Sequence, residues 1–426
     1  MKIAYLKSAI LASAIVSTGI GSALQAAPKS TPEQYTTLSL DSNVNGVAQR
    51  NSDRLLGPWG AAVAFDHTIW VANNLGGTVI ALRPDGGLLI PKGSNQGIIF
   101  TIPPAGGSGT GTPTGIRFNE ASGNKKATAF QVGGVTAQFL IATQDGAIAA
   151  WSGESAVTPV ATLVKIVPGA SYLGLALNSA QVGTATSPSQ YLYACNVNTG
   201  KIDVFDGSYV QQTSGFSFTD PNALAGYVPV NLKSLALPSI TEKGKKDSYL
   251  VVAYTQVLPA NPAAGTDLSA APLVKNGGGY LDVFKTDGTF VSRLDTNETG
   301  TATNLLNSPW GLAHAGNVFW VANHSDGLIH RFILTENAPT GEAVTVTSVE
   351  DPSPLQNSFE QTLDLTSVWA IHFDFKHVAP AELIKQGEDA FADDSIVCYT
   401  MHFTPKAGLA DGENGAGIFG RLHKDQ

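Results

Sequence analysis

The ionisable residues that could support chemistry lie in the last third of the chain. His324 directly follows Asn323 at the end of an apolar run, beside a tight turn. His372 and Asp374 are two residues apart, so both lie on one face if the segment is a strand. That spacing suits two ligands of a divalent metal ion, and it equally suits a hydrogen-bonded pair on a strand. The sequence contains no HExxH, GxSxG or Walker pattern.

A second group of candidates recurs at matching places along the chain. Tryptophans mark the entry of several predicted strands, and an amide, hydroxyl or phenol ends each second strand. Around one channel mouth, such groups would bind a small polar ligand in a concave, partly apolar pocket. The alternative is structural, because Asn beside a turn satisfies backbone groups and Trp between sheets packs. The group comprises Trp59, Asn73, Thr143, Asn196, Tyr254, Trp310, Asn323, His324, Trp369 and Thr400.

These candidates belong to a repeat that predicts the fold. Ser308 to Phe332 has the pattern of two short strands and a tight turn leading into a third, and five other stretches share it. Each repeat begins near a small residue, at spacings of 55, 59, 60, 77 and 59 residues. Small residues are required where the innermost strands of a radial array converge. The sequence therefore predicts an all-β, six-bladed β-propeller, with the small positions at Gly60, Gly115, Gly174, Ser234, Gly311 and Ala370.

The two ends of the chain have separate predicted roles. Residues 1–26 combine Lys2 and Lys7 with a small, uncharged apolar run, which is typical of a secretory signal peptide. Residues 27–426 are predicted to form the single propeller domain. Its sixth repeat lacks an outer strand, and Thr36 to Leu40 is predicted to supply it and to join the two ends of the ring.

Composition restricts the partners. The net charge is −9 and only 14% of residues are charged, with no Lys/Arg stripe, which argues against nucleic acid. Beyond the predicted signal peptide, no apolar stretch of the sequence is long enough to span a membrane. With the signal peptide, we therefore expect a secreted or periplasmic monomer. Cys195 and Cys398 fall in opposite blades, too far apart for a disulfide, and are predicted to be free, buried thiols.

An insertion interrupts the fourth repeat. Thr255 to Gly278 is apolar and rich in Pro and Ala, and its position predicts that it overhangs the rim of the channel. It is either a lid or partner-docking loop or a tolerated surface insertion. A short helix is predicted within Ala379 to Ala392, on the opposite face.

Several longer motifs resemble an uncharacterised family of secreted bacterial β-propellers with NHL-like repeats, some of which end in a PEP-CTERM sorting tail. The resemblance implies a propeller fold and export, and no activity. One departure concerns Tyr254, which is followed here by the uncharged TQVLPANPAAG where the family often has an acidic stretch. The motifs are GPWGAAVAFDHTIWVANN, FTDPNALAGYVPVNL, GGGYLDVFKTDG, SPWGLAHAGNVFWVAN and ADGENGAGIFGRL.

Three functional hypotheses follow. The first is a binding module without a cofactor, which takes up a small polar ligand or a protein partner at the channel mouth. The second is a metal-assisted hydrolase of the lactonase type, which needs a carboxylate and amides around a divalent ion, with Asp374 as the carboxylate. The third is a surface scaffold that uses the insertion at residues 255–278 to bind other proteins.

Overall fold

The computed structural model describes residues 35–124, 126–153, 160–180, 189–240, 242–256, 278–297, 303–337, 343–350, 368–374, 396–402 and 417–424. The predicted signal peptide, residues 257–277 of the insertion and the predicted helix lie outside these ranges. Residues Glu33–Gln426 form one compact unit.

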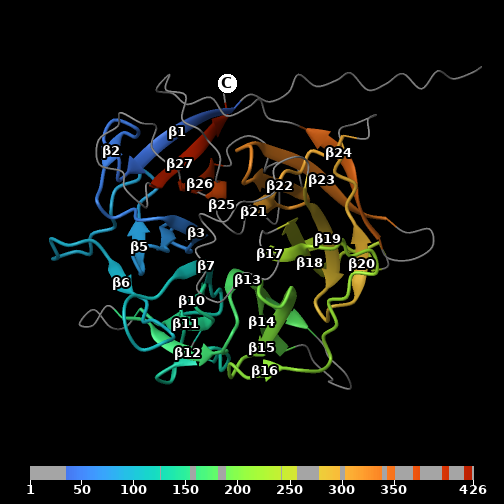
Figure 1. The fold of residues 1–426 in the computed structure, drawn as a ribbon, viewed down its shortest axis with the longest axis horizontal. Helices are drawn as coiled ribbons and strands as arrows, with labels where there is room; N and C mark the ends of the chain where they lie inside the picture. The colour runs from blue at the N-terminus through green and yellow to red at the C-terminus, as the bar shows by residue number, and fades with distance from the viewer. Residues whose placement is uncertain are drawn as a thin grey trace, which may run out of the picture. The chain divides into compact units, whose positions relative to one another are not determined.

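Six sheets stand around a common centre, which confirms the predicted six-bladed propeller (Figure 1). Their strands pair antiparallel, except for one short parallel pair at the outer edge of blade six. The first three blades each contain four strands. Blade one is β3 (Pro58–Val63), β4 (Ile69–Asn73), β5 (Thr78–Leu82) and β6 (Ile99–Thr101). Blade two is β7 (Pro113–Phe118), β10 (Phe139–Thr143), β11 (Ala147–Trp151) and β12 (Thr162–Ile166), with a hairpin of β8 (Gln131–Val132) and β9 (Val135–Thr136) in one connection. Blade three is β13 (Tyr172–Ala180), β14 (Ser189–Asn196), β15 (Lys201–Asp206) and β16 (Gln211–Gln212).

The other three blades continue the same order from the centre outward. Blade four is β17 (Tyr227–Pro238), β18 (Lys246–Gln256), β19 (Tyr280–Lys285) and β20 (Phe290–Arg293). Blade five is β21 (Pro309–Ala315), β22 (Val318–Asn323), β23 (Ile329–Asn337) and β24 (Ala343–Glu350). Blade six is β25 (Val368–Asp374), β26 (Ile396–His402), β27 (Gly417–Lys424), β1 (Tyr35–Ser42) and β2 (Arg50–Asn51).

Blade six combines strands from both ends of the described chain. β1 pairs antiparallel with β27, from Tyr35 opposite Lys424 to Ser42 opposite Ile418. Leu40 is only 2% exposed and packs in one apolar cluster with Phe419. This pairing covers the edge that β27 would otherwise present to solvent.

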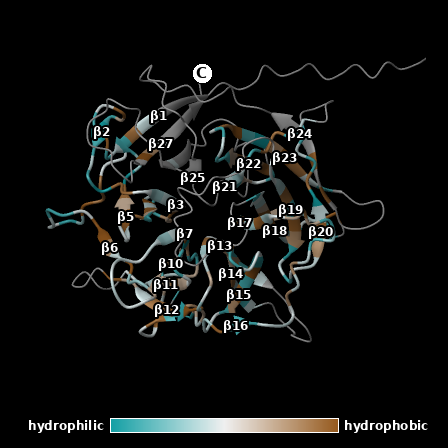
Figure 2. Cartoon of the chain, viewed as in Figure 1, coloured by the Kyte–Doolittle hydropathy of each residue, from teal (hydrophilic) through white to brown (hydrophobic). Residues whose placement is uncertain are grey.

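The core lies between neighbouring blades. The second strands β4 and β10 are buried at every residue because other blades cover both of their faces. One apolar cluster joins blades one and two, through residues such as Trp70 and Phe139, and another joins blades two and three. Figure 2 shows the resulting distribution, with hydrophobic residues prominent on strands such as β5, β6 and β23. The blades are thus held together by side-to-side packing.

All six inner strands change register at the same level. The shifts fall between Pro58 and Ala61 in β3 and at equivalent places in the other inner strands. A Cβ added to Gly60 would lie 2.3 Å from the backbone oxygen of Thr114, and one on Gly115 would lie 2.5 Å from that of Leu173. Both distances are far below contact, so the close approach of the strands explains the small residues there.

The register of blade four differs from the sequence prediction. A Cβ on Gly174 would lie 2.5 Å from the Cα of Asn231, so Asn231 occupies the small-residue position predicted for Ser234. Asn231 fits because its amide forms part of the contact: Nδ2 donates to the Trp310 oxygen at 2.7 Å. Ser234 lies three residues further along β17, where its hydroxyl donates to the Leu177 oxygen at 2.7 Å.

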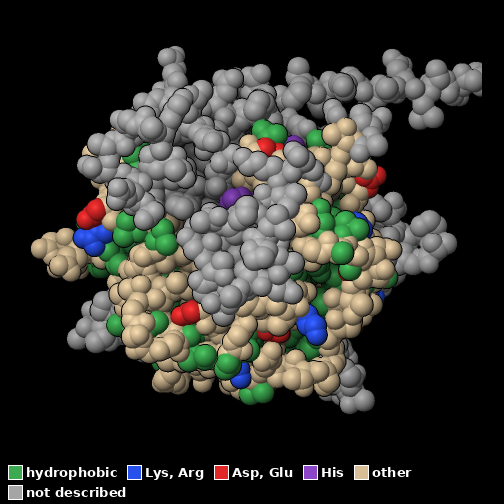
Figure 3. Space-filling view, in the orientation of Figure 1, with side chains coloured by type: hydrophobic (Ala, Val, Ile, Leu, Met, Phe, Trp, Pro, Cys, Tyr) green, Lys and Arg blue, Asp and Glu red, His purple; other side chains and the backbone are tan. Residues whose placement is uncertain are grey.

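Other predictions concern single features. Cys195 is free and buried, as predicted, whereas the side chain of Cys398 lies outside the described residues. No helix in the described ranges is long and apolar enough to cross a membrane. On the face in Figure 3, the charged side chains of the described residues are few and scattered.

Candidate functional site

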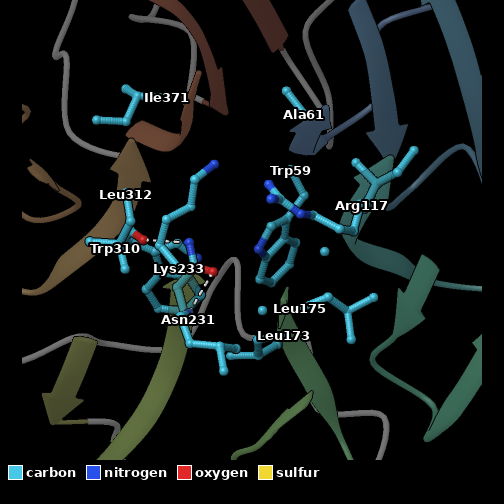
Figure 4. A pocket seen from close by; sticks show the side chains of 15 residues that line it. Trp59, Ala61, Arg117, Leu173, Leu175, Asn231, Lys233, Trp310, Leu312 and Ile371 are labelled. Carbon is cyan, nitrogen blue, oxygen red and sulfur yellow. Dashed lines mark hydrogen bonds between the residues drawn. The ribbon is translucent and has the colours of Figure 1, made fainter. Parts of the chain in front are cut away.

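The central channel contains a cavity lined by all six inner strands (Figure 4). The space open to the centres of water-sized molecules is ≈ 50 Å³. Since one water needs about 10–15 Å³ on this measure, the cavity has room for a molecule of only a few non-hydrogen atoms. The described part of its lining is mostly apolar or backbone, and its charged or amide side chains are those of Arg117, Asn231 and Lys233. The described lining residues are Trp59, Gly60, Ala61, Gly115, Ile116, Arg117, Leu173, Gly174, Leu175, Asn231, Leu232, Lys233, Trp310, Leu312 and Ile371.

Two cations extend into this cavity. Arg117 comes from β7 of blade two and Lys233 from β17 of blade four, and in Figure 4 their charged ends point into the same space. Each lies two residues after the small position of its inner strand. Blades one, three and five carry Ala62, Ala176 and Ala313 at that level. The two long basic side chains are therefore departures from the repeat.

The electrostatics of the cavity favour negative charge in a ligand. Burial, reinforced by the charge of Arg117, holds the pKa of Lys233 well below its ordinary value, although Glu120 acts in the opposite sense. Burial also lowers the pKa of Arg117. On neighbouring β21, burial and the charges of Lys233 and Arg117 lower the pKa of His314 to about 3. His314 is therefore neutral at physiological pH, and the permanent positive charge of the cavity resides on Arg117.

Within the described residues, little compensates this charge. Arg117 Nε is buried and has no hydrogen-bond partner there. The ion pairs between described residues join other side chains, and Glu120, which acts on both cations, is exposed to solvent. Arg117 and Lys233 are each half-buried. Buried charge without a counter-ion costs free energy, so the cavity is suited to an anion.

Of the predicted rim residues whose side chains the structure describes, two line the cavity. Trp59 and Trp310 belong to it, with ring centroids 5.9 Å apart and planes inclined by 55°. His324 is 7% exposed and its ring centroid lies 5.6 Å from that of Trp310. Tyr254 stacks on Tyr280 with centroids 4.7 Å apart.

The amides and hydroxyls of the rim group bond to the fold itself. Asn73 Nδ2 donates to the Arg54 oxygen, and Asn323 Nδ2 donates to the Leu305 oxygen, both at 2.9 Å. Thr143 accepts the Ala147 N–H at 2.8 Å within its turn. These contacts support the structural interpretation of those residues, and the ligand-binding role predicted for them stays a prediction.

Of the remaining predicted site residues, Asn196 and Thr400 also bond to the fold, whereas the side chains of the others are not described. Asn196 accepts the Ser171 N–H at 3.3 Å and donates to Asp203 at 2.9 Å. Thr400 Oγ1 donates to the Trp59 oxygen at 2.7 Å. Trp369, His372 and Asp374 lie in β25, and their side chains are outside the described set. In the part of the chain that is described, no group of three or more His, Cys, Asp or Glu side chains could hold a metal ion.

Sequence reasoning missed Arg117 and Lys233. A usable signal exists, because each is a basic residue at a level of the inner strand where blades one, three and five have alanine. The incorrect choice of Ser234 as the small position shifted blade four by three residues. With Asn231 in that position, Arg117 and Lys233 fall at the same level of their repeats.

Comparisons with known proteins give distant likenesses. No family model matches the chain. It is 26% identical over 312 residues to Uncharacterized protein R648 of Acanthamoeba polyphaga mimivirus, a match that spans 69% of this chain and 65% of R648. It is 24% identical over 340 residues to Uncharacterized protein L690 of the same virus, which spans 76% and 79% of the two chains. These viral relatives do not support the bacterial family suggested by the motifs.

Solved structures give similarly distant matches. Virginiamycin B lyase from Staphylococcus aureus has a TM-score of 0.41 and 10% identity, covering 91% of this chain and 98% of that chain. The PQQ-bound aldose sugar dehydrogenase from Streptomyces coelicolor has a TM-score of 0.40 and 14% identity, covering 93% and 100%. At these identities and TM-scores, the matches say nothing about the activity of the present chain.

Proposed function

We propose that this protein is a binding propeller that takes up a small anion in its central channel, between Arg117 and Lys233. The proposal depends on one observation: the side chains of Arg117 and Lys233 point into one narrow cavity, and neither forms an ion pair with another described residue. Following the expectation from residues 1–26, we place this activity outside the cytoplasm.

The chemistry of the two cations indicates what they bind. A guanidinium presents parallel N–H donors that match a carboxylate or phosphate, and the lysine nitrogen adds further N–H donors beside it. Arg117 Nε, buried without a partner among the described residues, is a donor that a ligand oxygen would satisfy. The cavity of ≈ 50 Å³ has room for a small anion. Trp59 and Trp310 provide aromatic walls beside it.

The other two hypotheses receive less support. A lactonase-type site needs a divalent cation in the channel, and the charge of Arg117 would repel such an ion. The scaffold hypothesis depends on the insertion, of which residues 257–277 lie outside the described ranges. Among the described residues, no contact favours either the hydrolase hypothesis or the scaffold hypothesis.

Thermal melts at low ionic strength test the proposal. Acetate, lactate, phosphate and sulfate are added in turn to the full chain and to Arg117→Met, with Arg54→Met as the control on an exposed arginine. A bound anion raises the Tm of the wild type by mass action, and we expect that rise to disappear in Arg117→Met and to persist in the control. A wild type that responds to no anion, or an equal rise in Arg117→Met, overturns the proposal.

A further inference from the structure

We infer that Lys233 reacts as a primary amine with the carbonyl group of a small 2-oxo acid, whose carboxylate pairs with Arg117. This inference rests on the proposed function and gives it a ligand class. It assigns different tasks to the two cations: Arg117 holds the charge of the ligand, and Lys233 forms a reversible covalent bond with the adjacent carbon.

The geometry brings the two groups to one place. Arg117 and Lys233 lie at the same level of inner strands in blades two and four, and their side chains enter one cavity (Figure 4). In a 2-oxo acid the carboxylate and the carbonyl carbon are directly bonded, so a narrow cavity can present both. A cavity of ≈ 50 Å³ suits acids as small as pyruvate or glyoxylate.

The lysine is held firmly and in apolar surroundings. On either side of it in β17, Leu232 packs in the core and Ser234 bonds to blade three, so the backbone is fixed. Leu312 and Ile371 line the same cavity, and the indole of Trp59 lies across it. Such surroundings stabilise the neutral amine relative to the ammonium ion.

A lysine attacks a carbonyl only in its neutral form, which most surface lysines do not adopt near pH 7. Here burial and the nearby charge of Arg117 lower the pKa of Lys233. Glu120 opposes that shift, but it lies in solvent beyond the end of β7. A desolvated lysine beside a second cation is a known way to obtain a nucleophilic amine at neutral pH.

The reaction balances without an oxidant or a further reactant. The nitrogen lone pair of Lys233 forms a bond to the carbonyl carbon, and the carbonyl oxygen leaves as water with the two hydrogens of the amine. The product is an imine that takes up one proton, and its positive charge lies near the ligand carboxylate. Hydrolysis reverses the reaction and returns the free lysine.

Reductive trapping tests this inference. The full chain is incubated near pH 7 with pyruvate or glyoxylate and sodium cyanoborohydride, and the adduct is located by peptide mass spectrometry. We expect one adduct, on Lys233, with little labelling of the exposed Lys243 and Lys246, which serve as internal controls. Lys233→Arg should abolish it. Arg117→Met should reduce trapping by roughly tenfold or more, because the ligand carboxylate loses its partner, while Arg117→Lys should retain part of it.

Lactate separates this inference from the proposed function, because it keeps the carboxylate and has a hydroxyl in place of the carbonyl. If lactate raises the Tm of the wild type and not of Arg117→Met, yet pyruvate leaves no adduct on Lys233, the channel binds anions and the covalent step is wrong. If neither acid stabilises the protein and no adduct forms, both proposals fail. An adduct that is unaffected by Arg117→Met overturns the role given to the arginine.

Discussion

The hydroxyl of Thr400 donates a 2.7 Å hydrogen bond to the backbone oxygen of Trp59, although 341 residues separate the two in the sequence. It connects the second strand of blade six to the inner strand of blade one. Two other buried threonines also bond to the next blade. Thr255, on the second strand of blade four, donates to the Pro309 oxygen at 2.9 Å, and Thr114, on the inner strand of blade two, donates to the Tyr172 oxygen at 2.7 Å. Buried hydroxyls thus join adjacent blades at the level where the inner strands converge.

Replacing Thr400 by valine removes one of these bonds and leaves the carbonyl of Trp59 without that donor. The shape is nearly unchanged, so we expect the free energy of unfolding to fall by about 1–3 kcal/mol, the cost of an unsatisfied buried polar group. Urea denaturation measures the change. Thr162→Val, on the exposed outer strand β12, is the matched control and should be nearly neutral. Equal losses in the free energy of unfolding for the two substitutions would show that the hydrogen bond of Thr400 does not stabilise the fold.

Lys233→Met should make the protein more stable while it abolishes the proposed chemistry. Burying the ammonium costs free energy, so an apolar side chain of similar length should raise the free energy of unfolding by about 1–3 kcal/mol near pH 7. Folding lowers the pKa of Lys233 below its ordinary value of 10.5. Between the folded-state pKa and 10.5 the unfolded chain binds more protons at this lysine than the folded chain does. The free energy of unfolding of the wild type therefore rises with pH in that window. The advantage of the variant should therefore be largest at acid pH and shrink toward pH 10.

Chemical denaturation at several pH values checks this expectation, with Lys246→Met as the control on an exposed lysine. The control should differ from the wild type by no more than about 0.5 kcal/mol at every pH. A Lys233→Met variant that is less stable than the wild type at all pH values would mean that the ammonium has a stabilising partner.

Arg293 fixes the segment that begins at Phe218 to blade four. Its guanidinium pairs with Asp220 and with Asp282, 2.8 Å from Asp282 Oδ1, and lies 3.6 Å above the ring of Tyr280. Arg293→Met leaves two buried carboxylates unpaired and should cost about 3 kcal/mol at pH 7. Burial already raises the pKa of Asp282 to about 6, against the effect of Arg293.

The pH dependence of this defect has a definite sign. Without Arg293 the carboxyl of Asp282 gains its proton more readily, so the defect of Arg293→Met should narrow as the pH falls from 7 to 5. Urea denaturation at both pH values measures it, and Arg293→Met combined with Asp282→Asn should recover part of the lost stability at pH 7. A defect that is independent of pH would show that the packing of Arg293, rather than its charge, holds the segment.

Gly60→Ala should disrupt the centre of the ring. The new Cβ would lie 2.3 Å from the oxygen of Thr114, a backbone atom that cannot move without separating two inner strands. We expect a loss of about 3 kcal/mol or more in the free energy of unfolding. Gly106→Ala is the control, because a Cβ there meets no atom within 4 Å. A mild Gly60→Ala variant, detected by thermal melting, would contradict the close approach of β3 and β7.

The architecture was predictable because its signals are local and repeated. Runs such as IWVAN (residues 69–73) and FLIAT (residues 139–143) are buried between blades, so their apolar pattern survives in every repeat. The small residues at Gly60 and Gly115 reflect a backbone contact that tolerates no side chain. In blade four the same position is filled by Asn231, whose amide bonds to the neighbouring strand, and a search for small residues could not find it.

The site was harder to predict for a physical reason. Asn and Thr at strand ends are suited both to binding a ligand and to satisfying backbone groups, and for Asn73 and Thr143 the structure shows the second use. Arg117 and Lys233 are two basic residues in apolar strands more than one hundred positions apart. They reach one cavity only because the blades close into a ring, and no local sequence pattern predicts that they meet.

The pairing of β1 with β27 also determines when this protein can finish folding. The first described strand has its partner far along the chain, from Tyr35 opposite Lys424 to Ser42 opposite Ile418. Blades one to five can assemble from contiguous segments, but the sixth sheet cannot form until β27 has been synthesised. Contacts of such long sequence separation form slowly. The ring, and with it the central cavity, is therefore completed late in folding.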